Sequence, residues 1–234
     1  MSCVLGDDAS ISVVQHPRRG RGIVTERALE VGSTISVGGP PYAAVLLPSL
    51  VEHRCSMCLK SLSQQRRRHH ETTRRCNGCG FVCYCSAECE AEDARQHSRQ
   101  CAALSQTSSF RRMDDSRSEH SALGRMGAAL LAGRCLWRRH DEAEAQKDSA
   151  VAHAQSADAI CFDMMAPGPT SEADEDVGAL VEQLDGFLPP GASSADVVAM
   201  LGSFRINEFS ILDAHGTAAI GVGCYPRAAL LNHS

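Results

Sequence analysis

The stretch that decides the fold is a series of ligand-like pairs in the first half of the chain: Cys55-Ser56-Met57-Cys58, Cys76-Asn77-Gly78-Cys79, Cys85-Ser86-Ala87-Glu88-Cys89 and His97-Ser98-Arg99-Gln100-Cys101. Seven of the twelve cysteines and one histidine make up these four pairs. A C-x2-C pair on a tight turn directs two thiolates at one metal ion, and the Asn-Gly of the second pair favours such a turn. Because a structural zinc ion takes four ligands, eight ligands predict two zinc ions.

The last two pairs are expected on a helix. Residues 86–104 are rich in Ala, Glu, Arg and Gln without Pro or Gly, and Ser86 is the expected N-cap. Ligands four residues apart share a helix face, so each pair can converge on one ion. Interleaved pairing then gives two sites: Cys55, Cys58, Cys85 and Cys89 at one ion, and Cys76, Cys79, His97 and Cys101 at the other. Structural zinc supplies roughly 10–16 kcal/mol in zinc-finger peptides, enough to replace a hydrophobic core.

Two residues beside the pairs leave the ligand set open. Cys83 lies close to Cys85 and could be an alternative ligand. His53 lies just before Cys55, but a lone histidine near a metal cluster is usually a bystander.

The order of the pairs, the core Tyr84-Cys85-Ser86-Ala87-Glu88-Cys89 and the closing His97-x3-Cys101 resemble the MYND zinc finger. A RING finger is also cross-braced, but its histidine usually lies in the middle of the ligand order, whereas His97 is seventh of eight. The resemblance favours Cys85 over Cys83 as the ligand. It implies a protein-interaction module that binds short proline-rich peptides.

The composition indicates a chain with a substantial core, since its 234 residues are 43% hydrophobic. The N-terminus has neither a basic n-region nor an apolar h-region, and apolar runs such as 128–132 are far shorter than the roughly 20 residues of a membrane helix. We therefore expect no membrane span and an intracellular protein of the nucleus, the cytoplasm or both. In a reducing compartment, clustered cysteines are metal ligands more often than disulfides.

The 17-residue gap between Cys58 and Cys76 contains two basic runs, Arg66-Arg67-Arg68-His69-His70 and Arg74-Arg75. They could contact nucleic-acid phosphates, as in a DNA-binding regulator. We favour a solvated surface insertion, because no aromatic residue is interleaved for base stacking, and the net charge of −5 adds no general attraction to nucleic acid.

The flanks of the cysteine-rich stretch predict strands before it and helices after it. Runs at 11–15, 22–27, 33–37 and 42–47 are rich in β-branched residues and predict a small antiparallel sheet, with Gly20-Arg21-Gly22 at a bend between two strands. Helices are expected at 121–139, 172–187 and 195–204, the last capped by Ser193 or Ser194, with a loose helix within 140–159.

A second resemblance rests on segments on both sides of the finger: Gly20-Arg21-Gly22, Asn207-Glu208-Phe209-Ser210-Ile211, Gly221-Val222-Gly223-Cys224-Tyr225-Pro226 and Leu230-Leu231-Asn232-His233-Ser234. Together they resemble the SET-and-MYND protein-lysine methyltransferases, in which the finger is inserted into a split SET domain. The resemblance implies an α+β fold: a small β-sheet SET fragment split by the two-zinc finger and a helical insertion. The expected parts are the N-terminal part of the split SET domain at 8–50, the finger at 51–104, the helical insertion at 105–205 and the start of the C-terminal SET part at 206–234.

The same resemblance implies a pocket for S-adenosylmethionine and a lysine of a histone or another protein as substrate. The residues carried over to this pocket are Gly20, Arg21, Gly22, Asn207, Asn232 and His233. Amide and imidazole groups can hydrogen-bond an amino-acid carboxylate and ammonium, and glycine permits close backbone approach. Taken singly, Asn207 and Asn232 would be assigned to the capping of turns or strand ends.

The chain stops at Ser234, where the resembling family continues with Cys-Asp-Pro-Asn and a tyrosine-bearing strand. Its three tyrosines, Tyr42, Tyr84 and Tyr225, lie at other positions. We therefore expect a C-terminally truncated chain with a complete finger, no assignable catalytic residue and no methyltransferase activity of its own. The competing hypothesis is a non-enzymatic adaptor that binds proline-rich peptides through the finger.

Overall fold

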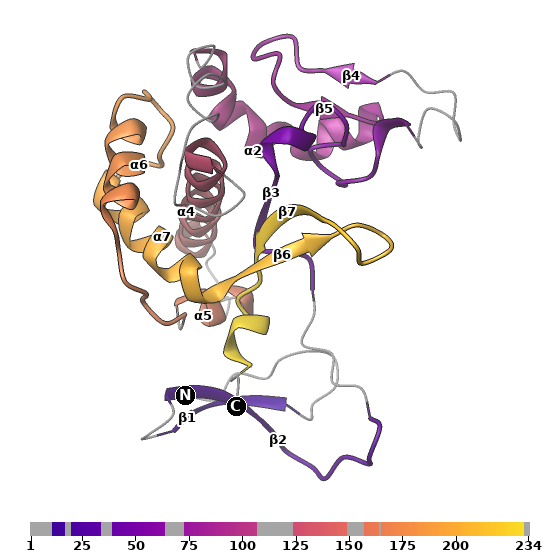
Figure 1. The fold of residues 1–234 in the computed structure, drawn as a ribbon. Helices are drawn as coiled ribbons and strands as arrows, with labels where there is room; N and C mark the ends of the chain where they lie inside the picture. The colour runs from indigo at the N-terminus through magenta and orange to yellow at the C-terminus, as the bar shows by residue number, and fades with distance from the viewer. Residues whose placement is uncertain are drawn as a thin grey trace.

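The computed structural model describes residues 11–16, 20–33, 39–63, 73–106, 124–148, 157–163 and 165–231. They form helices together with small antiparallel sheets, which confirms the predicted α+β class. The cysteine-rich segment lies at one end of the molecule and the hairpin of the first two strands at the other (Figure 1). The helices and a three-stranded sheet lie between them.

The three-stranded sheet joins the two flanks of the cysteine-rich segment. Its strands are β3 (Ala43–Leu46), β7 (Ala219–Cys224) and β6 (Glu208–Leu212), in the order β3-β7-β6. Val45 pairs with Val222 in the antiparallel register of β3 and β7. The backbones approach closely here, because a Cβ added at Gly221 would lie 2.4 Å from the carbonyl oxygen of Val45. The glycines of Gly221-Val222-Gly223 therefore allow this pairing.

The predicted single N-terminal sheet is wrong. Among the described strands, β1 (Ile11–His16) and β2 (Gly20–Thr25) form a sheet of two, whereas β3 pairs with β7. Gly20-Arg21-Gly22 lies inside β2, paired with residues 14–16, rather than at a bend. Composition cannot reveal a partner strand that lies nearly 180 residues away, as β7 does from β3. The strand expected at 33–37 lies outside the described residues apart from Ser33.

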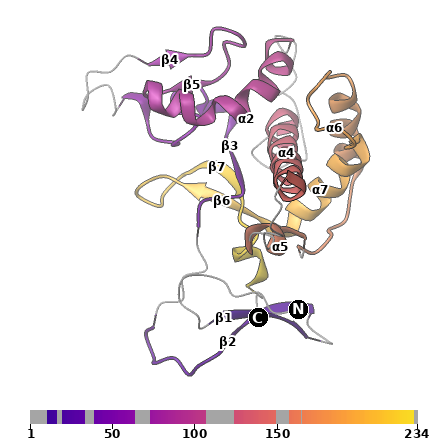
Figure 2. The same cartoon turned by 180° about the vertical axis from the view of Figure 1, so that it is seen from behind.

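We call the described residues outside the cysteine-rich segment the body of the molecule. Helix α4 (Gly124–Asp148) lies at its centre. It contacts β3 on one side and α6 (Glu172–Glu182) and α7 (Ser194–Asn207) on the other, an arrangement that Figure 2 shows from behind. It continues past the predicted end at 139, and Arg138 and Arg139 both contact Glu142 in the added turn. Three further helices lie among the described residues, namely α5 (Ala157–Asp163) and the short η1 (Pro48–Leu50) and η2 (Ala228–Leu230).

Helix ends follow local capping. Helix α7 begins after Ser193, whose backbone N–H is bonded to Asp196 at 2.8 Å, so Ser193 is the cap of the two serines considered. Helix α6 ends at Glu182, five residues before the predicted end, and turns follow up to Gly186 at φ +70°. No helix within the described ranges is long and apolar enough to cross a membrane.

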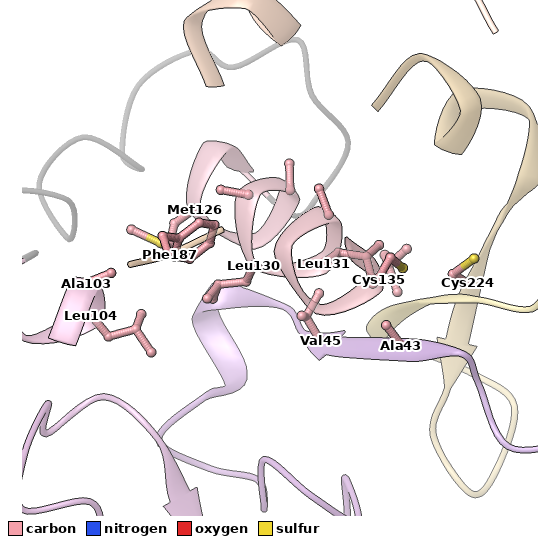
Figure 3. Packing of buried hydrophobic residues seen from close by; sticks show 14 of the residues in the cluster. Ala43, Val45, Ala103, Leu104, Met126, Leu130, Leu131, Cys135, Phe187 and Cys224 are labelled. Atoms are coloured by element: carbon pink, nitrogen blue, oxygen red, sulfur yellow. The ribbon is translucent and has the colours of Figure 1, made fainter. Parts of the chain in front are cut away.

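One hydrophobic core extends from the sheet into the cysteine-rich segment. Figure 3 shows Leu130, Leu131 and Cys135 of α4 above Val45 and Ala43 of β3, with Ala103 and Leu104 at one end and Cys224 at the other. Buried Cys55 and Tyr84 belong to the same cluster. The cysteine-rich segment and the body therefore share a core rather than meeting as separate units.

Candidate metal centre

The structure brings the eight predicted ligands together in two groups of four. One group is Cys55, Cys58, Cys85 and Cys89, and the other is Cys76, Cys79, His97 and Cys101. Within each group the candidate ligand atoms all lie within 4.8 Å of one another. This is the interleaved grouping that the spacing predicts.

The first group is built from a turn and the start of α2 (Ala87–Gln106). The N–H of Leu59 donates to the carbonyl of Cys55 at 2.9 Å and closes the turn that carries Cys55 and Cys58. Cys85 directly follows β5 (Cys83–Tyr84), which pairs with β4 (Arg74–Arg75). The Oγ of Ser86 then accepts the N–H of Cys89 at 3.3 Å, which confirms Ser86 as the N-cap.

The second group joins another tight turn to the middle of α2. The N–H of Gly80 donates to the carbonyl of Cys76 at 2.9 Å and closes this turn. A Cβ at Gly78 would lie 2.9 Å from the Sγ of Cys101, so glycine leaves room for the helix ligand to approach. His97 and Cys101 lie one helical turn apart on α2 and face the turn together.

Several separations of the ligand atoms are close to those of a tetrahedral zinc site. With Zn–S bonds of about 2.3 Å, tetrahedral geometry places two sulfurs about 3.8 Å apart and a sulfur and a nitrogen about 3.6 Å apart. In the first group, Cys58 and Cys85 have their sulfurs 3.6 Å apart, and so do Cys85 and Cys89. In the second group, the sulfurs of Cys76 and Cys101 are 3.7 Å apart, and His97 Nε2 lies 3.7 Å from Cys79 Sγ.

Comparison with known families agrees with this geometry, because residues 55–101 match the family model of the MYND finger. We call residues 55–101 the MYND finger, after the family model that they match. The segment whose spacing suggested this family is therefore the one that the model matches.

The similarity extends beyond the finger. The chain is 23% identical to histone-lysine N-methyltransferase Smyd1 of Mus musculus and 25% identical to SMYD1 of Homo sapiens, in each case over 98% of this chain and 42% of the relative. It is 23% identical to histone-lysine N-methyltransferase ASHR1 of Arabidopsis thaliana, over 97% of this chain and 43% of that protein. The chain thus spans less than half the length of these relatives.

Without metal, the thiols of the MYND finger differ in pKa. A hydrogen bond from Cys58 lowers the pKa of Cys55 to about 5, whereas burial raises the pKa of Cys85 to about 11. In the second group, burial opposes ionisation of Cys79, but hydrogen bonds from His97 and the backbone lower its pKa to about 6. Closely spaced thiolates repel one another, so some sulfurs keep protons until a divalent cation replaces them.

Neither alternative ligand belongs to the two groups. Cys83 lies on β5 with its side chain 2% exposed in the hydrophobic core, where burial raises its pKa. His53 is exposed in the turn before Cys55. The structure therefore agrees with the ligand set that the resemblance favours, which contains neither Cys83 nor His53.

Two of the arginines in the finger are paired with acidic residues. Arg74 contacts Glu90 on α2, and Arg75 contacts Glu52 at 3.0 Å. Arg66, Arg67, Arg68, His69 and His70 lie outside the described residues. One pair therefore lies within the finger, and the other joins the finger to the residues just before it.

The candidate cofactor residues that the structure describes lie on elements other than those that carry the metal ligands. Gly20, Arg21 and Gly22 are in β2, which contacts η2 near the C-terminal motif. Asn207 ends α7, is 4% exposed, and donates its side-chain N–H to the carbonyls of Ala166 and Ser203 at 2.9 and 2.8 Å. Its amide nitrogen thus bonds backbone carbonyls at the C-terminal end of α7. Asn232 and His233 lie outside the described residues.

Sequence reasoning missed the polar contacts that hold the MYND finger against α4. Arg99 of α2 makes two hydrogen bonds to Asp141, at 2.7 and 2.8 Å, and stacks over Trp137 at 4.1 Å. Arg134 of α4 and Asp93 of α2 are both buried, with Arg134 Nη2 3.9 Å from Asp93 Oδ1. No local spacing signals these contacts, because the partners are about 40 residues apart.

Proposed function

We propose that this chain is the zinc-binding MYND finger and adjoining SET-domain part of a protein related to S-adenosylmethionine-dependent protein-lysine methyltransferases. The observation that carries the proposal is the pair of interleaved four-ligand groups, set in a chain whose similarity to histone-lysine N-methyltransferases extends far beyond the finger. The shared core is consistent with a finger inserted in another domain, and we retain 8–50, 51–104, 105–205 and 206–234 as the parts.

The zinc ions in this proposal have a structural role. Each group supplies four protein ligands, so no position stays open for water or substrate. Bound zinc would hold the two turns against α2 and neutralise part of the thiolate charge. In this proposal the zinc ions take no part in methyl transfer.

For S-adenosylmethionine we propose the set Gly20, Arg21, Gly22, Asn207, Asn232 and His233. The two glycines would allow the cofactor to approach the backbone of β2. The Asn207 amide nitrogen is engaged by Ala166 and Ser203, so we assign its amide oxygen to the ammonium group of the cofactor.

Calorimetry with S-adenosylmethionine tests this site. We expect micromolar binding that Asn207→Ala abolishes. The matched control is Ser203→Ala, because Ser203 Oγ also bonds the carbonyl of Ala166 and contacts Asn207 Nδ2 at 3.1 Å without belonging to the proposed pocket. Equal loss in both variants would indicate a purely structural effect, and no binding to the wild-type chain would favour the adaptor.

The adaptor is the second candidate, supported by a finger whose eight proposed ligands all lie within 55–101. The side chains of Tyr42 and Tyr84 are hydrogen-bonded to Glu142 and Asp93, and Tyr225 packs edge-on against Phe209. We infer that these 234 residues alone do not transfer methyl groups. Turnover of a histone mixture with labelled S-adenosylmethionine would overturn that inference.

The proposed partners follow from the two candidates. Proline-rich peptides or other proteins would bind the finger, and a histone or another lysine-containing protein would be the substrate, in the nucleus, the cytoplasm or both. Nucleic acid is not a proposed partner. Titration of a labelled proline-rich peptide, with and without a zinc chelator, separates zinc-dependent peptide binding from nonspecific binding.

A further inference from the structure

Arg134 is a charged residue of α4 that lies buried against the MYND finger. It is 7% exposed, and it is the only Arg or Lys described as buried within the ranges that the structure covers. Its Nη1 donates to the carbonyl of Ala44 on β3 at 2.7 Å, and its Nε donates to Gln100 Oε1 on α2 at 3.2 Å. The guanidinium therefore bridges the sheet, the central helix and the finger helix.

The acidic neighbour of Arg134 lies between the two metal groups. Asp93 is 2% exposed, and its Oδ1 lies 3.9 Å from Arg134 Nη2. Its Oδ2 accepts the hydroxyl of Tyr84 at 2.8 Å. On α2, Asp93 is one turn after Cys89 of the first group and one turn before His97 of the second.

The zinc-loaded groups keep a net negative charge. A divalent cation with four thiolates leaves a formal charge of −2, and one with three thiolates and a neutral imidazole leaves −1. The Asp93 carboxylate adds to this charge at a site with little access to water. Buried charge is costly unless an opposite charge lies nearby, and Arg134 is a buried cation at this place.

We propose that Arg134 is the counter-charge of the zinc-loaded finger and couples zinc retention to the packing of α4 and β3. The residue lies outside 55–101, so a finger excised at those bounds lacks it. Because coupling between two sites is reciprocal, Arg134 slows zinc release and bound zinc stabilises the contacts of Arg134. The inference rests on zinc being the metal of the finger, which the zinc content of the wild-type chain tests separately.

The first test compares zinc release from the full 234-residue chain, followed with a chromogenic chelator. We expect Arg134→Met to release zinc about tenfold faster than wild type, within the usual range of coupling between sites. The control is Arg125→Met on the same helix, where Arg125 pairs with Asp176 at 2.8 Å on the exposed surface. Arg125→Met should release zinc at the wild-type rate. Equal rates for Arg134→Met and wild type would overturn the proposal.

A double variant separates charge from packing. Arg134→Met leaves Asp93 buried without its cation, so adding Asp93→Asn should restore much of the slow release. If the double variant releases zinc at least as fast as Arg134→Met, Arg134 acts through packing and the counter-charge is refuted.

A measurement on the wild-type chain covers the case in which Arg134→Met does not fold. Removal of zinc should increase hydrogen exchange in β3 and in α4 around residue 134, and leave α6, on the far side of α4, much less changed. Unchanged exchange in β3 and α4 after complete zinc removal would contradict the coupling.

Discussion

At the scale of single residues, the MYND finger depends on the missing side chain of a glycine as well as on its metal ligands. Gly78 is followed by Cys79 of the second group, and the space above its Cα is occupied by the Sγ of Cys101. The Asn-Gly pair thus closes the turn and also admits a ligand from α2. Replacing the glycine tests whether that approach is needed.

Gly78→Ala should weaken the second site, because the new methyl would lie 2.9 Å from Cys101 Sγ and must displace it. We expect a cost of about 1–3 kcal/mol in stability, as for overpacking in a core, and faster loss of one zinc ion of two. Zinc release and thermal unfolding measure both effects. Gly39→Ala is the control, since its methyl would meet nothing within 4 Å. If Gly78→Ala releases zinc at the wild-type rate, the turn accommodates the added methyl and the prediction is wrong.

Thiol pKa values give a second prediction at this scale. In the metal-free finger the pKa of Cys58 is far above 7, and those of Cys85 and Cys101 are about 11 and about 12, chiefly through hydrogen bonding at Cys58 and burial at the other two. These thiols carry protons at pH 7 and lose them to zinc. Zinc binding should therefore release at least these three protons and strengthen as pH rises. Calorimetry in buffers of different ionisation enthalpy counts the protons, and a count near zero would contradict these pKa values.

At the scale of elements, the decisive contact is the pairing of β3 with β7 across the finger and the helices. Helices were largely predictable, since composition and capping residues such as Ser86 and Ser193 act locally. Partner strands were not, because Val45 and Val222 lie far apart in the sequence and no local signal links them. The same holds for α2 and α4, whose contacts through Arg99 and Arg134 leave no periodic signal.

Two glycine substitutions test how the elements pack. At Gly221 an added methyl would meet backbone, 2.4 Å from the carbonyl oxygen of Val45, whereas at Gly133 it would meet the ring of Phe187 at 2.8 Å. A backbone gives way less easily than a side chain, so Gly221→Ala should cost more stability than Gly133→Ala, with about 1–3 kcal/mol for the latter. Urea unfolding of both variants measures the order. The reverse order would show that β3 and β7 can separate at little cost.

At the scale of the whole molecule, the finger shares a hydrophobic core with the rest of the chain. The ligand pairs and the motif around Tyr84 indicate the finger, but they do not reveal this core. Ala103 and Leu104 of α2 pack in the same cluster as Leu130 of α4 and Val45 of β3. The grouping of the eight ligands followed from pairs that are close in sequence, and the resemblance to the MYND finger already favoured Cys85 over Cys83. Of the six proposed cofactor residues, the structure describes four, because Asn232 and His233 lie outside the described residues.

Zinc content of the purified chain and of single-ligand variants, measured by native mass spectrometry, tests the two-site finger most directly. We predict two zinc ions for wild type, one for Cys58→Ser and one for Cys79→Ser, since these residues belong to different groups. Cys83→Ser, outside both groups, should keep two. A wild-type chain without zinc, or a Cys83→Ser variant that loses an ion while Cys58→Ser keeps both, would contradict the account.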